Sequence, residues 1–225
     1  MKALTTMMVA NRGESAVRGM RTAKAMGMKT VAVYSEADAN ARHVREADQS
    51  VCIGPAAVAE SYLGIEAILD AAQRTGADCI HPGYGFLSEN QVFASACEAH
   101  GIEFIGPPNS AIEVMGDKAR AKRAMIEAGV PCVPGYQGDD QSLAILLSEA
   151  KGVGLPVMVK AAAGGGGRGM RLVHEASELE SAIGLAQSEA QNAFGSSELI
   201  IEKAVVRPRH VEIQVFADKA GNTVY

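Results

Sequence analysis

Residues 157–173 have the sequence VMVKAAAGGGGRGMRLV, which predicts a strand, a glycine loop and a second strand. Five glycines within six positions are costly in a regular element, at roughly 0.5–1 kcal/mol each, unless the backbone must approach another group closely. Free backbone amides in such loops bind phosphate, and Lys160 and Arg168 add positive charge. We therefore expect a glycine hairpin that covers a phosphate chain.

Two common nucleotide motifs do not fit this loop. Gly164, Gly166 and Gly169 match G-x-G-x-x-G, but a dinucleotide site requires a helix directly after the loop, whereas residues 171–173 favour a strand. A Walker A loop ends in Gly-Lys-Ser/Thr, and this loop does not. The remaining hypothesis is a mobile hairpin that folds over a nucleotide, and the alternative is a solvent-exposed hairpin without a ligand.

Residues 1–105 alternate predicted strands with predicted helices. The expected strands cover residues 7–10, 30–34, 50–53, 79–81 and 102–105, and the expected helices cover residues 14–26, 61–75 and 91–100. This order predicts an α/β fold with a Rossmann-like, doubly wound parallel sheet. The first strand–helix turn, Asn11 to Glu14, has a single glycine, so we expect no nucleotide site in this domain.

Two loops of this domain should lie at the carboxyl ends of strands, where open α/β sheets bind ligands. They are residues 11–14 and residues 81–90. The second contains His81, Tyr84, Glu89 and Asn90. These side chains are either ligand contacts or parts of a rigid turn in which Ser88 or Asn90 caps the next helix.

The segment Gly106-Pro107-Pro108 predicts a domain boundary, followed by linker helices over residues 106–132. Ser110 should cap the first helix, and Lys118 should open the second. A lysine at a helix N-terminus opposes the helix dipole, which indicates a bound anion. The alternative is an ordinary surface lysine.

Residues 133–204 should form a subdomain around the glycine hairpin, and residues 205–225 should begin another domain. A capping box from Ser177 to Glu180 predicts the start of a helix that ends near Phe194. A strand is expected over residues 198–206, where Glu202 and Lys203 are either a solvated edge or ligand contacts. Alternating apolar residues predict a further, half-buried strand over residues 211–217.

The composition fits a globular protein of one or two domains, since 48% of the 225 residues are hydrophobic. The net charge of −5 argues against a nucleic-acid partner, and no run reaches the roughly 18 apolar residues of a membrane span. The four cysteines lie far apart, which predicts reduced thiols in a cytoplasmic protein: Cys52, Cys79, Cys97 and Cys132.

Taken together, these motifs resemble biotin carboxylase, the ATP-grasp component of biotin-dependent carboxylases. The resemblance runs along the whole chain, through Ala10 to Glu14, His81 to Asn90, Met115 to Lys118, Lys160 to Met170, Glu202-Lys203 and Pro208 to Gln214. Residues 133–141 are most similar to the α subunits of acyl-CoA carboxylases of the methylcrotonyl, geranyl or propionyl type. Ser15 and Ala204 depart from the family pattern, and Ala204 implies a looser adenine pocket.

The resemblance implies ATP-dependent carboxylation of biotin with bicarbonate, through carboxyphosphate. Lys118 and Lys160 would contact the ATP phosphates, under a lid formed by Gly164, Gly165, Gly166, Gly167 and Gly169. Glu202 and the backbone around Lys203 would hold the adenine, His210 would lie on the ribose–phosphate side, and Tyr84 would lie near the biotin.

The resemblance also implies a Mg²⁺ cofactor, a biotin carboxyl carrier domain and a carboxyltransferase subunit as partners, and a homo-oligomer. The family's magnesium carboxylates, bicarbonate arginine and general base are expected beyond Tyr225. No catalytic or metal residue is therefore assigned within the chain, and the 225 residues alone are expected to be inactive.

Two alternatives stay open. Another ATP-grasp ligase, such as a carbamoyl-phosphate synthetase, shares the glycine lid, although the loop at residues 81–90 favours biotin carboxylase. A non-catalytic module that binds nucleotide or another subunit is the second alternative.

Overall fold

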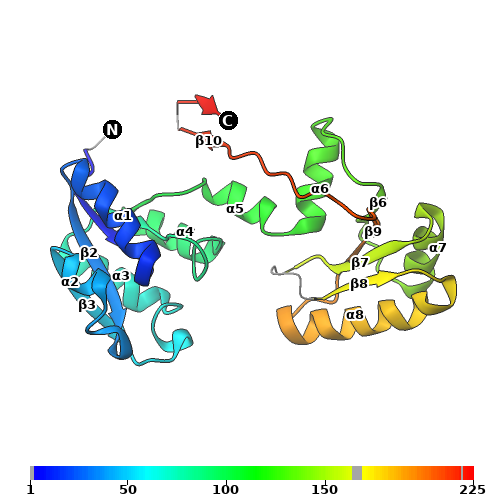
Figure 1. Cartoon of the computed structure of the whole chain (residues 1–225), viewed down its shortest axis with the longest axis horizontal. Helices are drawn as coiled ribbons and strands as arrows, with labels where there is room; N and C mark the ends of the chain where they lie inside the picture. The colour runs from blue at the N-terminus through cyan, green and yellow to red at the C-terminus, as the bar shows by residue number, and fades with distance from the viewer. Residues whose placement is uncertain (1–2, 164–168, 219) are drawn as a thin grey trace. The chain divides into compact units, whose positions relative to one another are not determined.

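The computed structural model describes residues 3–163, 169–218 and 220–225, and the chain divides into two compact units, residues 1–117 and 118–225. Figure 1 colours the first unit from blue to green and the second from green to red. The division falls inside the expected linker: helix α5 (Asn109–Met115) belongs to the first unit and helix α6 (Lys118–Glu127) to the second.

The first unit contains a five-stranded sheet that is parallel throughout, in the order β3-β2-β1-β4-β5. Its strands are β1 (Thr6–Val9), β2 (Lys29–Ser35), β3 (Gln49–Gly54), β4 (Cys79–His81) and β5 (Glu103–Phe104). Its other helices are α1 (Gly13–Ala25), α2 (Arg42–Glu46), α3 (Ile65–Thr75) and α4 (Gln91–Ala99), with short 3-10 turns at Glu36–Asp38 and Val58–Glu60. The predicted α/β fold is confirmed.

Side chains of β1 alternate between the two faces of this sheet, as the two-residue period of a strand requires. Met8 packs with Ile68 of α3 and Phe93 of α4 in one buried cluster. Met7 and Val9 belong to a second cluster with α1. The helices therefore cover both faces, which is the doubly wound arrangement (Figure 1).

The second unit is built on a four-stranded antiparallel sheet in the order β6-β9-β7-β8. These strands are β6 (Gly135–Tyr136), β7 (Val157–Ala161), β8 (Met170–Val173) and β9 (Leu199–Lys203). The remaining elements are α7 (Leu143–Val153), a 3-10 turn (Ala176–Glu178), α8 (Leu179–Phe194), β10 (Phe216–Ala217) and β11 (Thr223–Val224). Because β7 and β8 pair antiparallel, the predicted hairpin is confirmed, although Gly164 to Gly167 and Arg168 lie outside the described residues.

Alternation along β7 decides what each face of this sheet carries. Val157 and Val159 are buried in a cluster with residues of α7 and α8. Lys160 belongs to the opposite set of positions, as does Ile200 of β9, which packs against Ala119 of α6. The sheet therefore has an apolar face covered by α7 and α8, and a mixed polar face where α6 lies.

Four local predictions are wrong. The helix expected from residue 61 begins at Ile65, because Gly64 is its N-cap. Helix α5 begins at Asn109 rather than after a Ser110 cap, and the observed capping box joins Glu175 to Glu178, not Ser177 to Glu180. Residues 211–215 form no strand, because they lack the pairing partner that a strand requires among the described residues.

Candidate functional site

A half-buried carboxylate on the mixed face of the second sheet is shared by two lysines. Glu202 Oε1 accepts a hydrogen bond from Lys122 Nζ at 2.8 Å, and Oε2 accepts one from Lys160 Nζ at 2.5 Å. The side chains of Glu202 and Lys122 are only 15% and 8% exposed. These three residues, called the lysine–glutamate cluster below, come from β9, α6 and β7.

Strand register brings two of these residues together. Lys160 pairs with Ile200 and Met158 pairs with Glu202, so Lys160 and Glu202 are diagonal neighbours on the same face. On the other side of β9, the residue in register with Glu202 is Gly135. A Cβ at Gly135 would lie 2.1 Å from Ile201 O, so a glycine is needed for β6 to pair this closely with β9. The same Cβ would lie 3.0 Å from Lys122 Nζ and would crowd this ammonium.

The two lysines decide the charge state of Glu202. Burial raises the pKa of Glu202, but the hydrogen bonds and positive charges of Lys122 and Lys160 outweigh burial, so the net effect lowers the pKa. Glu202 is therefore ionised at neutral pH. A carboxylate in this state accepts hydrogen bonds, for example from the amino group of a nucleobase.

Lys118 lies where β7 leads into the glycine stretch. Its backbone amide donates to Ala162 O at 3.1 Å, and its ammonium lies 3.3 Å from Ala161 O and 3.4 Å from Ala162 O. On the far side of the stretch, the Ala161 amide donates to Gly169 O. Gly169 has a φ of +67°, and a Cβ there would lie 3.2 Å from Ala161 Cβ, so only glycine fits without strain.

Two predicted contacts are engaged elsewhere. The ammonium of Lys203 donates to Gly154 O at 2.8 Å and to Leu155 O at 2.7 Å, while its amide donates to Pro134 O. Lys203 therefore fixes the turn before β7. His210 is exposed, and its Nε2 lies 2.9 Å from Glu212 Oε1. Among the described contacts, no side-chain hydrogen bond joins Lys203 or His210 to the lysine–glutamate cluster, and the predicted adenine contact of the Lys203 backbone stays a prediction.

Lys122 is the functional candidate that the sequence analysis missed. It follows Lys118 by four residues on α6, so both lysines lie on one side of the helix. That spacing was the available signal. Its partner Glu202 is 80 residues further along the chain, and no local pattern predicts such a contact.

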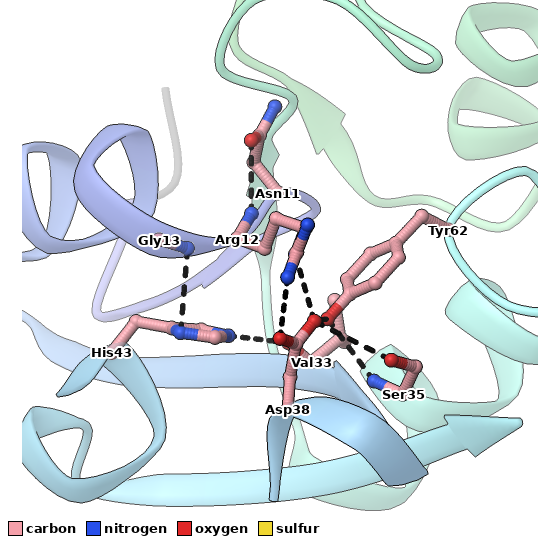
Figure 2. A network of polar contacts seen from close by, with 8 residues as sticks. All are labelled: Asn11, Arg12, Gly13, Val33, Ser35, Asp38, His43 and Tyr62. Atoms are coloured by element: carbon pink, nitrogen blue, oxygen red, sulfur yellow. Dashed lines mark hydrogen bonds and ion pairs between the residues drawn. The ribbon is translucent and has the colours of Figure 1, made fainter. Parts of the chain in front are cut away.

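The first unit has a different polar network at the carboxyl ends of β1 and β2, which Figure 2 shows. Arg12 Nε donates to Asp38 Oδ2 at 2.7 Å, and Arg12 Nη2 donates to Oδ1 at 2.5 Å. Tyr62 Oη donates to Asp38 Oδ2 at 2.6 Å and accepts from the Ser35 amide at 3.0 Å. The hydrogen bond from Arg12 lowers the pKa of Asp38 more than burial raises it.

This network lies where a doubly wound sheet ordinarily binds a nucleotide. In such sheets the first strand–helix turn carries the phosphates, and an acidic residue after the second strand binds the ribose. Arg12 occupies that turn, Asp38 follows β2, and each satisfies the other. Both side chains are therefore engaged in an ion pair of the protein's own, and the expectation that this unit has no nucleotide site stays a prediction.

The imidazole of His43 is completely buried beside this network. It lies 3.2 Å from Val33 O through Nε2, and its Nδ1 accepts from the Gly13 amide at 3.4 Å (Figure 2). Burial lowers the pKa of His43, which outweighs the effects of the Val33 carbonyl and Asp38. The neutral imidazole therefore stabilises the start of α1.

The loop at residues 81–90 is held as a rigid turn. Asn11 Nδ2 donates to Pro82 O at 2.8 Å and to Tyr84 O at 2.9 Å. Asn90 caps α4 by accepting from the Phe93 amide, so the capping alternative is confirmed for Asn90. The Tyr84 ring is exposed, and its hydroxyl donates to Glu14 Oε2 at 2.7 Å. Its assignment to the biotin side stays a prediction.

The described residues contain neither a membrane-spanning helix nor a metal-ligand group. No helix in these ranges is long and apolar enough to cross a bilayer. No group of three histidine, cysteine, aspartate or glutamate side chains is arranged to hold a metal ion.

Comparison with protein families gives two matches that divide the chain as the structure does. Residues 3–112 match the biotin carboxylase N-terminal domain, and residues 117–225 match the carbamoyl-phosphate synthase L chain ATP-binding domain.

Similar proteins give the same assignment. The chain is 57% identical to the mitochondrial methylcrotonoyl-CoA carboxylase subunit alpha of Dictyostelium discoideum, over 100% of this chain and 32% of that protein. A biotin carboxylase–beta-gamma-ATP complex from Campylobacter jejuni superposes with a TM-score of 0.95 at 50% identity, over 99% of this chain and 50% of that one.

A third relative is the biotin carboxylase domain dimer of the Hydrogenobacter thermophilus 2-oxoglutarate carboxylase, with MgADP, ADP and bicarbonate. Its TM-score is 0.92 at 46% identity, over 100% of this chain and 49% of that one. The chain thus spans about a third of the curated relative and about half of the solved structures. It has the N-terminal and ATP-grasp domains of the biotin carboxylase family, as its motifs predicted.

Proposed function

We propose that residues 118–225 bind ATP and that the chain acts in the ATP-dependent carboxylation of biotin by bicarbonate. ATP would transfer a phosphoryl group to bicarbonate, and the resulting carboxyphosphate would supply the carboxyl group to biotin on a carrier domain. The observation that carries the proposal is that the ammonium of Lys118 lies against the Ala161 and Ala162 carbonyls at the end of β7, while Lys160 of the same strand bonds Glu202. The ATP and bicarbonate complexes of the relatives support it.

The chain's own residues have distinct tasks in this proposal. Lys118 and Lys160 neutralise phosphate charge, and such electrostatic stabilisation, with positioning, is the main contribution of a protein to phosphoryl transfer. Glu202 accepts a hydrogen bond from the adenine amino group, while Gly169 and its preceding glycines cover the phosphates. Lys203 supports the site by fixing the turn before β7. A role for His210 on the ribose side is retained as a proposal.

Magnesium supplies charge neutralisation between phosphate oxygens when it is bound with ATP. Among the described residues, no group of three histidine, cysteine or carboxylate side chains is arranged to hold it. A carboxyltransferase subunit, a carrier domain and self-association into a homo-oligomer remain proposed partners. A cytoplasmic location is proposed from the cysteine usage, whereas the Dictyostelium relative is mitochondrial.

The biotin carboxylase assignment is preferred to a carbamoyl-phosphate synthetase. Both share the ATP-binding domain family that matches residues 117–225, but residues 3–112 match a domain named for biotin carboxylase. The loop at residues 81–90, which first favoured this choice, lies within the matched range.

ATP binding is tested by titration calorimetry of the chain and its Lys160→Met variant. Loss of a charge-assisted contact to phosphate should weaken ATP roughly tenfold to a hundredfold. Lys151→Met, which removes an exposed lysine from the last turn of α7, is the matched control and should leave affinity unchanged. Equal affinity in the wild type and Lys160→Met would contradict the assignment.

A further inference from the structure

If the proposed function is correct, on which this inference rests, Lys160 must bond both Glu202 and the phosphates of the nucleotide. In the structure its ammonium is bonded to Glu202 Oε2 at 2.5 Å. To bind phosphate at the end of β7, the ammonium must give up this contact or share it. Glu202 would then keep one cationic partner, Lys122.

Lys122 is placed to remain when Lys160 leaves. Its ammonium bonds the other carboxylate oxygen, Oε1, so the two lysines do not compete for one atom. Its side chain is 8% exposed, whereas that of Lys160 is 24% exposed. The more accessible lysine therefore faces the solvent from which a ligand would enter, and the more buried one lies behind the carboxylate.

Helix α6 holds Lys122 against the sheet. Ala119 is fully buried with Ala162 and Ile200, and the Lys118 amide donates to Ala162 O. Gly135 leaves the space that the ammonium of Lys122 occupies. A lysine fixed in this way cannot follow a ligand that arrives at the glycine stretch.

We propose that Lys122 is a positioning residue, which keeps Glu202 a fixed carboxylate while Lys160 changes partner from Glu202 to the phosphates of the nucleotide. An ammonium is suited to such an exchange because it has three donors on a flexible stem and no fixed bidentate geometry. Glu202 would thus keep a cationic partner, Lys122, both before the nucleotide binds and after Lys160 has moved to the phosphates.

The charges that face Glu202 come from two elements. Lys122 approaches from α6 and Lys160 from β7. On the β6 side, the residue in register with Glu202 is Gly135, which has no charge. The ammonium of Lys203 is bonded to the Gly154 and Leu155 carbonyls. Burial raises the pKa of Glu202, and the two lysines reverse this. In an ATP complex without Lys122, neither ammonium would bond Glu202, only the adenine contact would oppose the effect of burial, and Glu202 would take up a proton more readily as ATP binds.

The test compares Lys122→Met with the wild type by titrating ATP calorimetrically in buffers of different ionisation enthalpy. The variant should bind ATP roughly tenfold to a hundredfold more weakly at about pH 8 and should take up additional protons on binding. Since a proton taken up on binding favours the complex at low pH, the loss of affinity in the variant should shrink as pH falls. Adenosine, which has no phosphate to recruit Lys160, should lose much less affinity.

The outcomes are separable. A wild type that does not bind ATP contradicts the proposed function itself. A variant that loses the same affinity at each pH, with no extra proton, indicates a merely structural role for Lys122 and overturns the inference, as does unchanged ATP affinity.

Two further variants keep the test decisive. Lys122→Arg retains the charge, so it should bind ATP without the extra proton even where Lys122→Met proves unstable; an extra proton in Lys122→Arg would overturn the inference. In a Glu202→Gln background, Lys122→Met should change no proton uptake, because the titrating carboxylate is gone.

Discussion

Each unit of the molecule contains a carboxylate paired with cationic side chains, buried in the first unit and half-buried in the second, but the two sites differ in what the cations can do. In the first unit, Arg12 donates two parallel hydrogen bonds to Asp38, and the Tyr62 hydroxyl donates a third. In the second unit, two lysines from different elements each take one oxygen of Glu202. A planar guanidinium fork is fixed by its geometry, whereas an ammonium can rotate toward a new partner.

Both sites pair a carboxylate with cationic side chains, but we interpret the first as structural and propose the second as a ligand site. The Arg12–Asp38 pair occupies the crevice of a doubly wound sheet with the protein's own charges. In the lysine–glutamate cluster, the ammonium of Lys160 lies on β7, the strand that leads into the glycine stretch, and can exchange Glu202 for another partner. The position in the fold alone would suggest the first unit as the nucleotide site, whereas the proposed function assigns the nucleotide to the second.

The largest effect is expected from removal of the carboxylate in the first unit. Asp38→Ala leaves the Tyr62 hydroxyl and the Arg12 guanidinium without their acceptor, which should lower the free energy of unfolding by about 3 kcal/mol. ATP affinity of the folded protein should stay unchanged. Denaturant unfolding and calorimetry measure the two quantities.

Asp70→Ala is the matched control for that variant. Asp70 also pairs with an arginine, Arg74, but both side chains are more than half exposed. Exposed pairs contribute little, so no measurable loss of stability is expected. A similar loss in both variants would mean that the Arg12–Asp38 network is no more important than a surface pair.

A smaller loss is expected from Gly135→Ala in the second unit. Its Cβ would lie 2.1 Å from Ile201 O and 2.9 Å from Glu202 Cα, so β6 must shift away from β9 at a cost of about 2 kcal/mol. The substitution should also weaken ATP binding, because the added methyl would lie 3.0 Å from the Lys122 ammonium that bonds Glu202.

Gly152→Ala provides the control, since it lies in α7 with no atom near the added Cβ. Alanine is the better helix former, so stability should rise by about 0.5–1 kcal/mol. Full ATP affinity in Gly135→Ala would contradict the role given to the β6–β9 pairing.

The smallest effect is a pH dependence confined to the first unit. The folded-state pKa of His43 lies below its ordinary value of 6.5, because burial disfavours the imidazolium. The stability it provides is therefore complete above pH 6.5 and decreases as pH falls below it, by at most about 1.4 kcal/mol per pH unit. Half-buried His81 is shifted the same way.

The carboxylates do not interfere in this window. The pKa values of Asp38 and Glu202 are lowered from 3.8 and 4.5, so their stabilising effect is lost only as pH falls below those values. His43→Gln should flatten the curve between about pH 6.5 and pH 5, measured by denaturant unfolding at each pH. An unchanged slope in this variant would show that His43 does not titrate in this range.

Patterns with a local cause were predictable from the sequence. Apolar runs on both sides of the glycines placed the β7–β8 hairpin correctly, and the strand–helix order predicted the parallel sheet of the first unit. Alternation was misleading over residues 211–217, since period two indicates a strand only where another strand can pair with it.

Contacts between distant residues were not predictable. Arg12 and Asp38 are 26 residues apart, and Lys122 and Glu202 are 80 residues apart. Each pair depends on which strands become neighbours and on the register between them, which a single sequence does not specify. Glu202 was identified through family resemblance, whereas its charge partner required the folded sheet.

Hydrogen exchange of the chain with and without ATP tests the contrast between the two units most directly. Amides in residues 157–163 and 199–203 should exchange more slowly with ATP bound, because β7 and β9 carry the lysine–glutamate cluster. Amides in residues 8–12 and 30–38, around the Arg12–Asp38 network, should exchange at the same rate in both conditions. Protection of residues 8–12 and 30–38 by ATP, with residues 157–163 and 199–203 unchanged, would place the nucleotide in the first unit and contradict the account.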